Sequence, residues 1–178
     1  MTGLKIIISL SVVMAMTNII TTDQESGNIS PDCIECLCKG ATGCNMSAGC
    51  QSTYQGANFC GPFHISWQYW LDAGSPTIRG ADEPSYENFQ DCTSEPFCSV
   101  RTVKKYLHKF IISKGVDCNK DGVIDCIDFA LTQKLGGYNC DQEDNRPTKY
   151  YDRFYKCWNN TIETVKRLFI HPDRQSLP

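Results

Sequence analysis

The sequence predicts a disulfide-rich α+β fold that is mostly helical. All twelve cysteines of this 178-residue chain lie after residue 32, and an even set of this size is typical of a disulfide framework of up to six bridges. Apolar residues recur at helical spacing over 98–113, residues 150–169 are amphipathic, and a further helix is expected over 127–135. Strand-like alternation is confined to a short stretch around Phe63 and Ile65. We therefore expect one domain over residues 33–158, with a C-terminal extension over residues 159–178.

The first 22 residues have the pattern of a secretory signal peptide. Lys5 precedes an apolar run from Ile6 to Met16 that is too short to span a bilayer and is followed by polar residues. We expect cleavage between Ala15 and Asp23, followed by a polar N-terminal arm over residues 23–32. No second apolar run approaches transmembrane length, so the mature protein is expected to be secreted and extracellular.

The net charge is −3, from 17 basic and 20 acidic residues. Loss of Lys5 with the leader lowers it to −4. A protein of this charge is not attracted to nucleic acid or to anionic membranes. Three Asn-X-Ser/Thr sequons, at Asn28, Asn45 and Asn159, fit a secreted glycoprotein, and Asn28 is the weakest acceptor because Pro31 follows it closely.

The stretch CIECLCKGATGC, residues 33–44, contains four cysteines. The spacing C-x2-C-x-C-x5-C is compatible with zinc, but no histidine is close in sequence and a secreted chain favours disulfides. Short loops suggest three local pairs, although spacing alone does not establish connectivity: Cys38–Cys44, Cys50–Cys60 and Cys92–Cys98. From Cys33 to Cys60 we expect short turns of helix or hairpin and no long element.

The later elements follow in order along the chain. GPFHIS, residues 61–66, begins as a strand and leads into an aromatic helical stretch from Trp67 to Leu71. Residues 75–85 are rich in Pro, Gly and Ser and predict an exposed loop. Gly136-Gly137 ends the helix over 127–135. After a polar linker, residues 150–169 are expected to form one or two amphipathic helices.

Residues 117–128, DCNKDGVIDCID, fill every position of a twelve-residue EF-hand loop between two predicted helices. The expected calcium ligands are one backbone carbonyl and five side chains: Val123, with Asp117, Asn119, Asp121, Asp125 and Asp128. Ile124 is expected to point into the core. Asp128 is shorter than the usual Glu at the last position, so we expect weak binding, in the ~10⁻⁴–10⁻³ M range of extracellular modules. The alternative is a polar connection fixed by Cys118 and Cys126 without an ion.

CIECLCKGATGC, followed by CGPFHIS and QYWLDAG, resembles the start of the invertebrate-type (i-type) lysozymes of the destabilase family. The likeness continues through DCTSEPFCSVRTVKKYLHKF and DCNKDGVIDCIDFALTQKLGGYNC, which is most similar to the insect branch, and covers roughly Cys33 to Trp158. It implies a lysozyme-like α+β fold with a first helix, a small β-hairpin sheet, a helical lobe and a sugar cleft. It also implies hydrolysis of the β-1,4 bond of peptidoglycan by two carboxylates, which retaining enzymes place ~5–5.5 Å apart.

The chain departs from the family at both catalytic positions. The family's proton-donating Glu falls on Ala41, and its catalytic Asp falls on Thr53 or Tyr54, depending on which cysteine the count starts from. None of these is a carboxylate, so no catalytic residue is assigned and hydrolysis is expected to be lost or very weak. Among nearby groups, Glu35 and Asp72 are more simply explained as surface or capping carboxylates.

The sequence still predicts a sugar-binding surface, with candidate residues drawn from one stretch: Phe63, His64, Trp67, Tyr69 and Trp70. Core packing is favoured for Phe63 and Trp70, while Trp67 and Tyr69 remain open. We expect a secreted, monomeric lysozyme-like protein of innate defence or digestion that binds peptidoglycan or a chitin-like oligosaccharide. The alternatives are an active muramidase with relocated carboxylates and a non-enzymatic structural or partner-binding disulfide domain.

Overall fold

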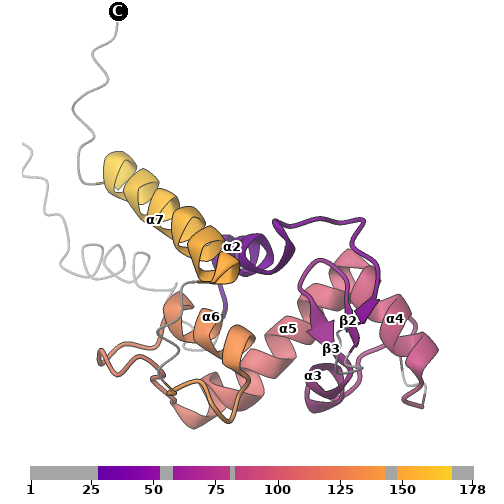
Figure 1. The fold of residues 1–178 in the computed structure, drawn as a ribbon. Coiled ribbons are helices and arrows are strands. Elements are labelled where there is room, and N and C mark those ends of the chain that lie inside the picture. The colour runs from indigo at the N-terminus through magenta and orange to yellow at the C-terminus, as the bar shows by residue number, and fades with distance from the viewer. Residues whose placement is uncertain (1–27, 53–57, 81–82, 143–147, 170–178) are drawn as a thin grey trace, which may run out of the picture.

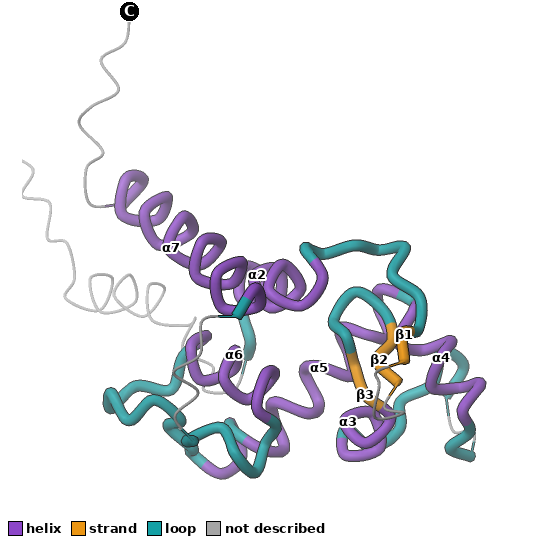
Figure 2. The backbone as a smooth tube through the Cα atoms, viewed as in Figure 1, coloured by secondary structure: helices purple, strands orange, loops and turns teal. Residues whose placement is uncertain are grey.

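The computed structural model describes residues 28–52, 58–80, 83–142 and 148–169. This part of the chain is mostly helical, with one small sheet (Figure 1). The elements in chain order are α2 (Pro31–Thr42), β1 (Gln51–Ser52), β2 (Asn58–Cys60), β3 (Ile65–Ser66), α3 (Trp67–Asp72), α4 (Tyr86–Ser94), α5 (Pro96–Phe110), the 3-10 helix η1 (Ile112–Lys114), α6 (Cys126–Leu135) and α7 (Lys149–Phe169). Helix α5 lies between two groups: the sheet with α3 and α4 is on one side, and α2, α6 and α7 are on the other (Figure 2).

Helix α2 begins before the cysteine-rich segment. The hydroxyl of Ser30 accepts a hydrogen bond from the Cys33 N–H at 3.2 Å, and Pro31 occupies the first turn, where its missing N–H costs nothing. Gly43 ends the helix at a φ of 73°, a conformation that glycine adopts without strain. The expected arm over 23–32 is therefore wrong at its last two residues. The expectation of no long element from Cys33 to Cys60 is also wrong, because α2 has 12 residues.

The sheet has three antiparallel strands in the order β1-β2-β3. Phe59 pairs with Gln51 on one side and with Ser66 on the other. Phe63 lies in the turn between β2 and β3, so the strand starts at Ile65, later than expected. Gly61 opens this turn with a φ of 73°, and a Cβ at this position would lie 1.7 Å from the Thr93 carbonyl oxygen. Only glycine allows the turn to pack this closely on α4.

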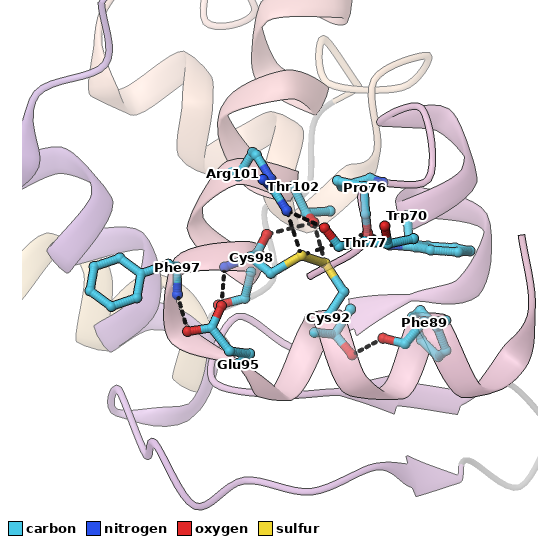
Figure 3. The surroundings of a disulfide bond; sticks show 12 residues. Trp70, Pro76, Thr77, Phe89, Cys92, Glu95, Phe97, Cys98, Arg101 and Thr102 are labelled. Carbon is cyan, nitrogen blue, oxygen red and sulfur yellow. Dashed lines mark hydrogen bonds between the residues drawn. A yellow bond between two sulfur atoms is a disulfide. The ribbon is translucent and has the colours of Figure 1, made fainter. Parts of the chain in front are cut away.

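Helices α4 and α5 meet at Glu95. Its carboxylate accepts hydrogen bonds from the Phe97 and Cys98 N–H groups at 3.1 and 2.6 Å, and Pro96 starts α5. Figure 3 shows this corner, where the Cys92–Cys98 disulfide joins the two helices and the Arg101 guanidinium reaches the Cys98 sulfur at 3.2 Å. Helix α4 itself was not predicted from the sequence. Its polar surface weakens the helical pattern, and only Phe89, Cys92 and Thr93 are buried.

Six disulfides pair all twelve cysteines. Three are the local pairs that the spacing suggested: Cys38–Cys44, Cys50–Cys60 and Cys92–Cys98. The other three join distant segments: Cys33–Cys126, Cys36–Cys157 and Cys118–Cys140. The first two of these tie α2 to α6 and α7, and each bridge of this kind contributes ~2–4 kcal/mol. Because the four cysteines of residues 33–44 are oxidised, they offer no thiolate to zinc.

Helix α7 continues for 21 residues from Lys149 to Phe169 and packs along α2. The ring of Tyr150 lies against Gly40, where a Cβ would come within 3.0 Å of a ring carbon. The expected boundary between residues 158 and 159 falls inside this single helix. None of the helices in the described ranges is long and apolar enough to cross a membrane.

Candidate functional site

A groove of about 470 Å³ lies between the sheet and the end of α6. One side, here called the sheet wall, consists of residues of β2, β3, their connecting turn and α3: Phe59, His64, Ser66, Gln68, Tyr69 and Asp72. The opposite side, the helix wall, is the segment Gln133–Asn139 at the end of α6. Tyr106 of α5 lies between the two walls. The groove is therefore assembled from three separate parts of the chain.

Two tyrosines form the base of the groove. The rings of Tyr69 and Tyr106 stack with centroids 3.6 Å apart. The Tyr69 hydroxyl donates to Oε1 of Gln133 at 2.7 Å, and Nε2 of Gln133 donates to the Phe63 carbonyl at 3.0 Å. Gln133 therefore links the helix wall to the sheet wall. Burial raises the pKa of Tyr69 well above its usual value and also raises the pKa of Tyr106, so both phenols remain protonated donors.

His64 lies at the turn between β2 and β3 with a left-handed φ of 55°. Its ring stacks on Phe59 with a centroid distance of 4.8 Å. Burial is the main cause that lowers the pKa of His64, and the cation of Lys134 on the opposite wall lowers it further. At neutral pH the imidazole is therefore uncharged. It can accept or donate a hydrogen bond, but it adds no positive charge to the groove.

Asp72 is the only carboxylate among the described residues that line the groove. The Lys109 ammonium lies 3.0 Å from its Oδ1 and 2.9 Å from its backbone carbonyl oxygen. A glycosidase of this kind needs two carboxyl groups at one site, and no second carboxylate among the described residues lines this groove beside Asp72.

The family's position for the proton donor, Ala41, lies in the last turn of α2 and is half-buried. The next residue, Thr42, donates through its hydroxyl to the Pro62 carbonyl at 2.6 Å, so this end of α2 touches the turn between β2 and β3. The methyl side chain of Ala41 cannot act as a general acid for any bound substrate. The positions for the second carboxylate, Thr53 and Tyr54, are outside the described residues.

The structure buries three of the five candidate sugar-binding residues, and for Phe63 and Trp70 it confirms the core packing that the sequence favoured. Phe63, Tyr69 and Trp70 are 2%, 8% and 0% exposed, so their rings have no open face for a sugar. The Trp70 indole instead donates to the Pro76 carbonyl at 2.8 Å. Trp67 is half-buried in an aromatic cluster with Trp70, Tyr86 and Phe89 and does not line the groove. Of the five candidates, His64 lines the groove with its ring, and Tyr69 forms part of the base.

Sequence reasoning missed the groove residues of the helix wall. Lys134, Tyr138 and Asn139 are all exposed and line the groove. The one sequence feature that could have indicated these residues is Gly136-Gly137, where α6 ends and the chain turns. Gly137 is required there because a Cβ would lie 2.1 Å from the Phe110 ring.

Glu35, the other candidate replacement carboxylate, faces away from this groove. It lines a cleft of about 710 Å³ between α2 and α7 and a smaller cavity beside Phe63 and Val100. Asp72 lines neither of these two cavities. The two carboxylates therefore do not flank a common binding site.

The calcium-like loop uses its carboxylates to hold its own backbone. Both oxygens of Asp117 accept backbone hydrogen bonds, from Lys120 at 2.7 Å and Gly122 at 2.8 Å. Asp128 is fully buried and accepts from the N–H groups of Cys118, Asn119 and Asp125, at 2.7, 3.3 and 2.8 Å.

The remaining polar side chains of this loop also bond locally instead of converging on one point. Asp121 is exposed and accepts from the Val123 N–H and the Asn119 amide, and Asp125 caps α6. The expectation that Ile124 is in the core is wrong, since it is 41% exposed. Within the described ranges no group of three or more His, Cys, Asp or Glu side chains is gathered to hold a metal ion. Calcium binding stays a prediction from the sequence.

The three predicted glycosylation sites lie on the surface. Asn28, Asn45 and Asn159 are all exposed. The amide oxygen of Asn45 accepts from the Ser47 N–H at 3.0 Å in the turn after α2, and Asn159 lies on α7. Glycan attachment at these positions stays a prediction.

A family model described as Destabilase matches residues 30–157. The chain belongs to the destabilase family. Two relatives support the assignment. A protein described as "Invertebrate-type lysozyme" from Ruditapes philippinarum is 28% identical over 134 residues, or 75% of this chain and 85% of the relative. "Lysozyme 1" from Crassostrea virginica is 30% identical over 115 residues, or 65% of this chain and 53% of the relative.

Solved lysozyme structures share the fold of this destabilase. The inhibitor-bound lysozyme from Meretrix lusoria is 25% identical with a TM-score of 0.54, over 73% of this chain and 91% of that chain. The same lysozyme in complex with PliI from Aeromonas hydrophila gives a TM-score of 0.53, over 72% of this chain and 89% of that chain. The lysozyme-like fold is therefore confirmed, while the similarity to the insect branch stays a prediction.

Proposed function

We propose that this destabilase is a secreted protein of innate defence or digestion that binds peptidoglycan or a related β-1,4-linked glycan and hydrolyses it very weakly or not at all. The observation that carries the proposal is the contrast between the groove and the end of α2. The groove has polar donors on both walls and a base of stacked tyrosines. The family's proton-donor position at the end of α2 holds Ala41.

The carboxylates of the groove also support weak or absent hydrolysis. Glycosidases of this kind need one protonated and one ionised carboxyl group on either side of the scissile bond, ~5–5.5 Å apart in retaining enzymes. Asp72 is the one carboxylate found among the described lining residues, and Lys109 pairs with it. Neither Thr53 nor Tyr54 supplies a second carboxylate. Removal of such groups typically lowers rates by several orders of magnitude.

The alternative of an active muramidase with relocated carboxylates has little support. It requires two acidic groups at one site, whereas Glu35 and Asp72 line different cavities. The alternative of a purely structural disulfide domain does not account for a groove whose two walls are joined by Gln133 and lined by exposed polar side chains.

A sedimentation assay tests the binding half of the proposal. The protein is mixed with insoluble peptidoglycan and, separately, with chitin, and the fraction in the pellet is measured with and without soluble oligosaccharide as competitor. Reduced and alkylated protein, which lacks the six bridges, is the control for adsorption of an unfolded chain. We expect saturable pelleting that soluble oligosaccharide reverses. Native protein that stays in the supernatant with both polymers would contradict the proposal and favour a partner-binding domain.

A further inference from the structure

The helix wall is held by a hydrogen bond to the base of the groove, by a hydrogen bond within the wall and by a disulfide that follows it. The Gly137 N–H donates to the Tyr106 hydroxyl at 2.8 Å, and the Asn139 N–H donates to the Gly136 carbonyl at 3.1 Å. The disulfide between Cys118 and Cys140 fixes the chain directly after Asn139. A binding segment that is already ordered loses less conformational entropy when a ligand binds.

Tyr138 presents its ring at this wall. It is 74% exposed, yet the ring is positioned by an edge-to-face contact with Phe110 at 4.9 Å between centroids. The ammonium of Lys114 lies 5.8 Å from the Tyr138 centroid. A single exposed aromatic side chain needs no explanation by itself, but this one is oriented, lines the groove and leaves most of its surface to solvent. Such a ring can bury the apolar face of a sugar.

The charges of the groove favour an anion. Asp72 is neutralised by Lys109, whose ammonium contacts both its carboxylate and its backbone carbonyl. Lys134 on the opposite wall lines the groove and has no ion-pair partner within the described part of the chain. Lys114 adds a second cation beside Tyr138. Lys134 is thus a cation without an ion-pair partner among the described lining residues, in a protein whose net charge is −3.

From these observations we propose that Tyr138 and Lys134 form a subsite for a carboxylate-bearing sugar, so that the groove selects acidic glycans over neutral ones. Tyr138 packs under the ring of the sugar, and Lys134 pairs with its carboxylate. The inference rests on the proposed glycan-binding function and adds the class of glycan. In peptidoglycan the carboxylate has two sources, the lactyl group of a peptide-free muramyl residue and the stem peptide of a substituted one.

The experiment uses calorimetric titration of the intact protein with four oligosaccharides of equal length. A chitin oligomer is neutral. A peptide-free muramyl oligomer carries free lactyl carboxylates, and its methyl ester has the same shape without the charge. A fragment that keeps its stem peptides has amide-linked lactyl groups and carboxylates on the peptide, so it separates the two sources. Each titration is run at low and at physiological salt.

For the unsubstituted protein we expect the acid to bind about fivefold more tightly than its ester at low salt, with a smaller ratio at physiological salt. Lys134→Gln should abolish this ratio, because it removes the charge that distinguishes the acid from its ester. Lys105→Gln, an exposed lysine of α5 outside the groove, changes the net charge equally and should keep the ratio. Tyr138→Ala should weaken all four oligosaccharides about tenfold, because it removes apolar contact area rather than charge.

The outcomes separate this inference from the function on which it rests. If the protein binds none of the four oligosaccharides, both are overturned. If it binds acid and ester equally, or if Lys134→Gln keeps the ratio, the subsite is overturned while glycan binding stands. If Lys134→Gln weakens only the fragment with stem peptides, the carboxylate that Lys134 recognises belongs to the peptide, and the subsite for a carboxylate-bearing sugar is likewise overturned.

Discussion

The two walls of the groove differ in how they are held and in what they contribute. The sheet wall depends on a short three-stranded sheet whose tight turn packs on α4 at Gly61. The helix wall depends on side-chain hydrogen bonds and on the Cys118–Cys140 bridge. The helix wall carries the exposed cation and aromatic ring, Lys134 and Tyr138. Ala41 does not line the groove, and the neighbouring Thr42 bonds to Pro62 in the turn of the sheet wall.

This difference shows how hydrolysis and binding can be separated in one fold. The family's catalytic positions fall at the end of α2 and just after β1 in the sequence. The groups best placed to hold a ligand, Lys134 and Tyr138, lie at the end of α6, 80 to 97 residues later in the chain. Substitution of the catalytic carboxylates therefore leaves the helix wall intact.

The largest expected effect is on the sheet wall. Gly61→Ala places a methyl group against the Thr93 carbonyl, so the turn must move away from α4, and we expect a loss of more than about 3 kcal/mol in the free energy of unfolding. Gly74→Ala is the matched control, because Gly74 also has a positive φ, of 81°, but has open space around it. It should cost only ~1–2 kcal/mol of backbone strain. Urea denaturation measures both, and equal losses would contradict the packing described here.

The next effect concerns the calcium-like loop, which carries Cys118 and is joined to the end of the helix wall by the Cys118–Cys140 bridge. Asp128→Asn replaces an acceptor-only group that holds three backbone N–H donors, so we expect a loss of ~2–3 kcal/mol even in calcium-free buffer. Asp121→Ala removes an exposed side chain with local hydrogen bonds and should cost less than ~1 kcal/mol. Thermal unfolding with chelator reports these differences.

The same variants test the calcium prediction. Millimolar calcium should raise the melting temperature of the unsubstituted protein and have no effect on Asp121→Ala. An identical calcium response in both would mean that the loop is a polar connection without an ion.

A smaller effect is expected at the link between the walls. Gln133→Leu removes the acceptor of the buried Tyr69 hydroxyl and the donor to the Phe63 carbonyl, and it should cost ~2 kcal/mol. Tyr69→Phe, which removes the hydroxyl itself, should cost less, and the double variant should be less destabilised than the sum of the two. Additive losses in urea denaturation would show that Gln133 and Tyr69 act independently.

The smallest effect concerns pH. The pKa of His64 is lowered from 6.5, first by burial and then by Lys134, so the folded protein binds fewer protons here than the unfolded chain. Its contribution to stability is present above pH 6.5 and is lost as the pH falls below this value. Between pH 7.5 and pH 5 the melting temperature should fall further for the unsubstituted protein than for His64→Gln. Equal falls in the melting temperatures of the two proteins would show that His64 does not contribute to this pH dependence.

Much of the fold could be predicted because its signals are local. The helix over 98–113 corresponds to α5, because its apolar periodicity coincides with the face it buries. The helix over 127–135 corresponds to α6, which ends at Gly136 as the Gly136-Gly137 pair predicts. Helix α2 was harder, because four cysteines within 33–44 hide its periodicity until the bridges to α6 and α7 are known. Helix α4 gave a weak signal because only three of its nine residues are buried.

The candidate site was less predictable because the groove is a product of tertiary packing. Local pattern identified the aromatic stretch from Phe63 to Trp70, but aromatic side chains fill cores as readily as they line clefts, and most of these are buried. Tyr138 and Lys134 carry no motif, and their placement depends on α6 packing near β2 and β3. The absence of a carboxylate at position 41, in contrast, is a property of the sequence alone.

The most direct test of the central claim is a hydrolysis assay on purified peptidoglycan. Release of reducing ends is measured across pH 4–8 with millimolar calcium, beside an active lysozyme of the same fold as the standard. We predict turnover below ~10⁻³ of the standard, indistinguishable from buffer. Clear turnover that Glu35→Gln or Asp72→Asn abolishes would contradict the claim and establish an active enzyme with relocated carboxylates.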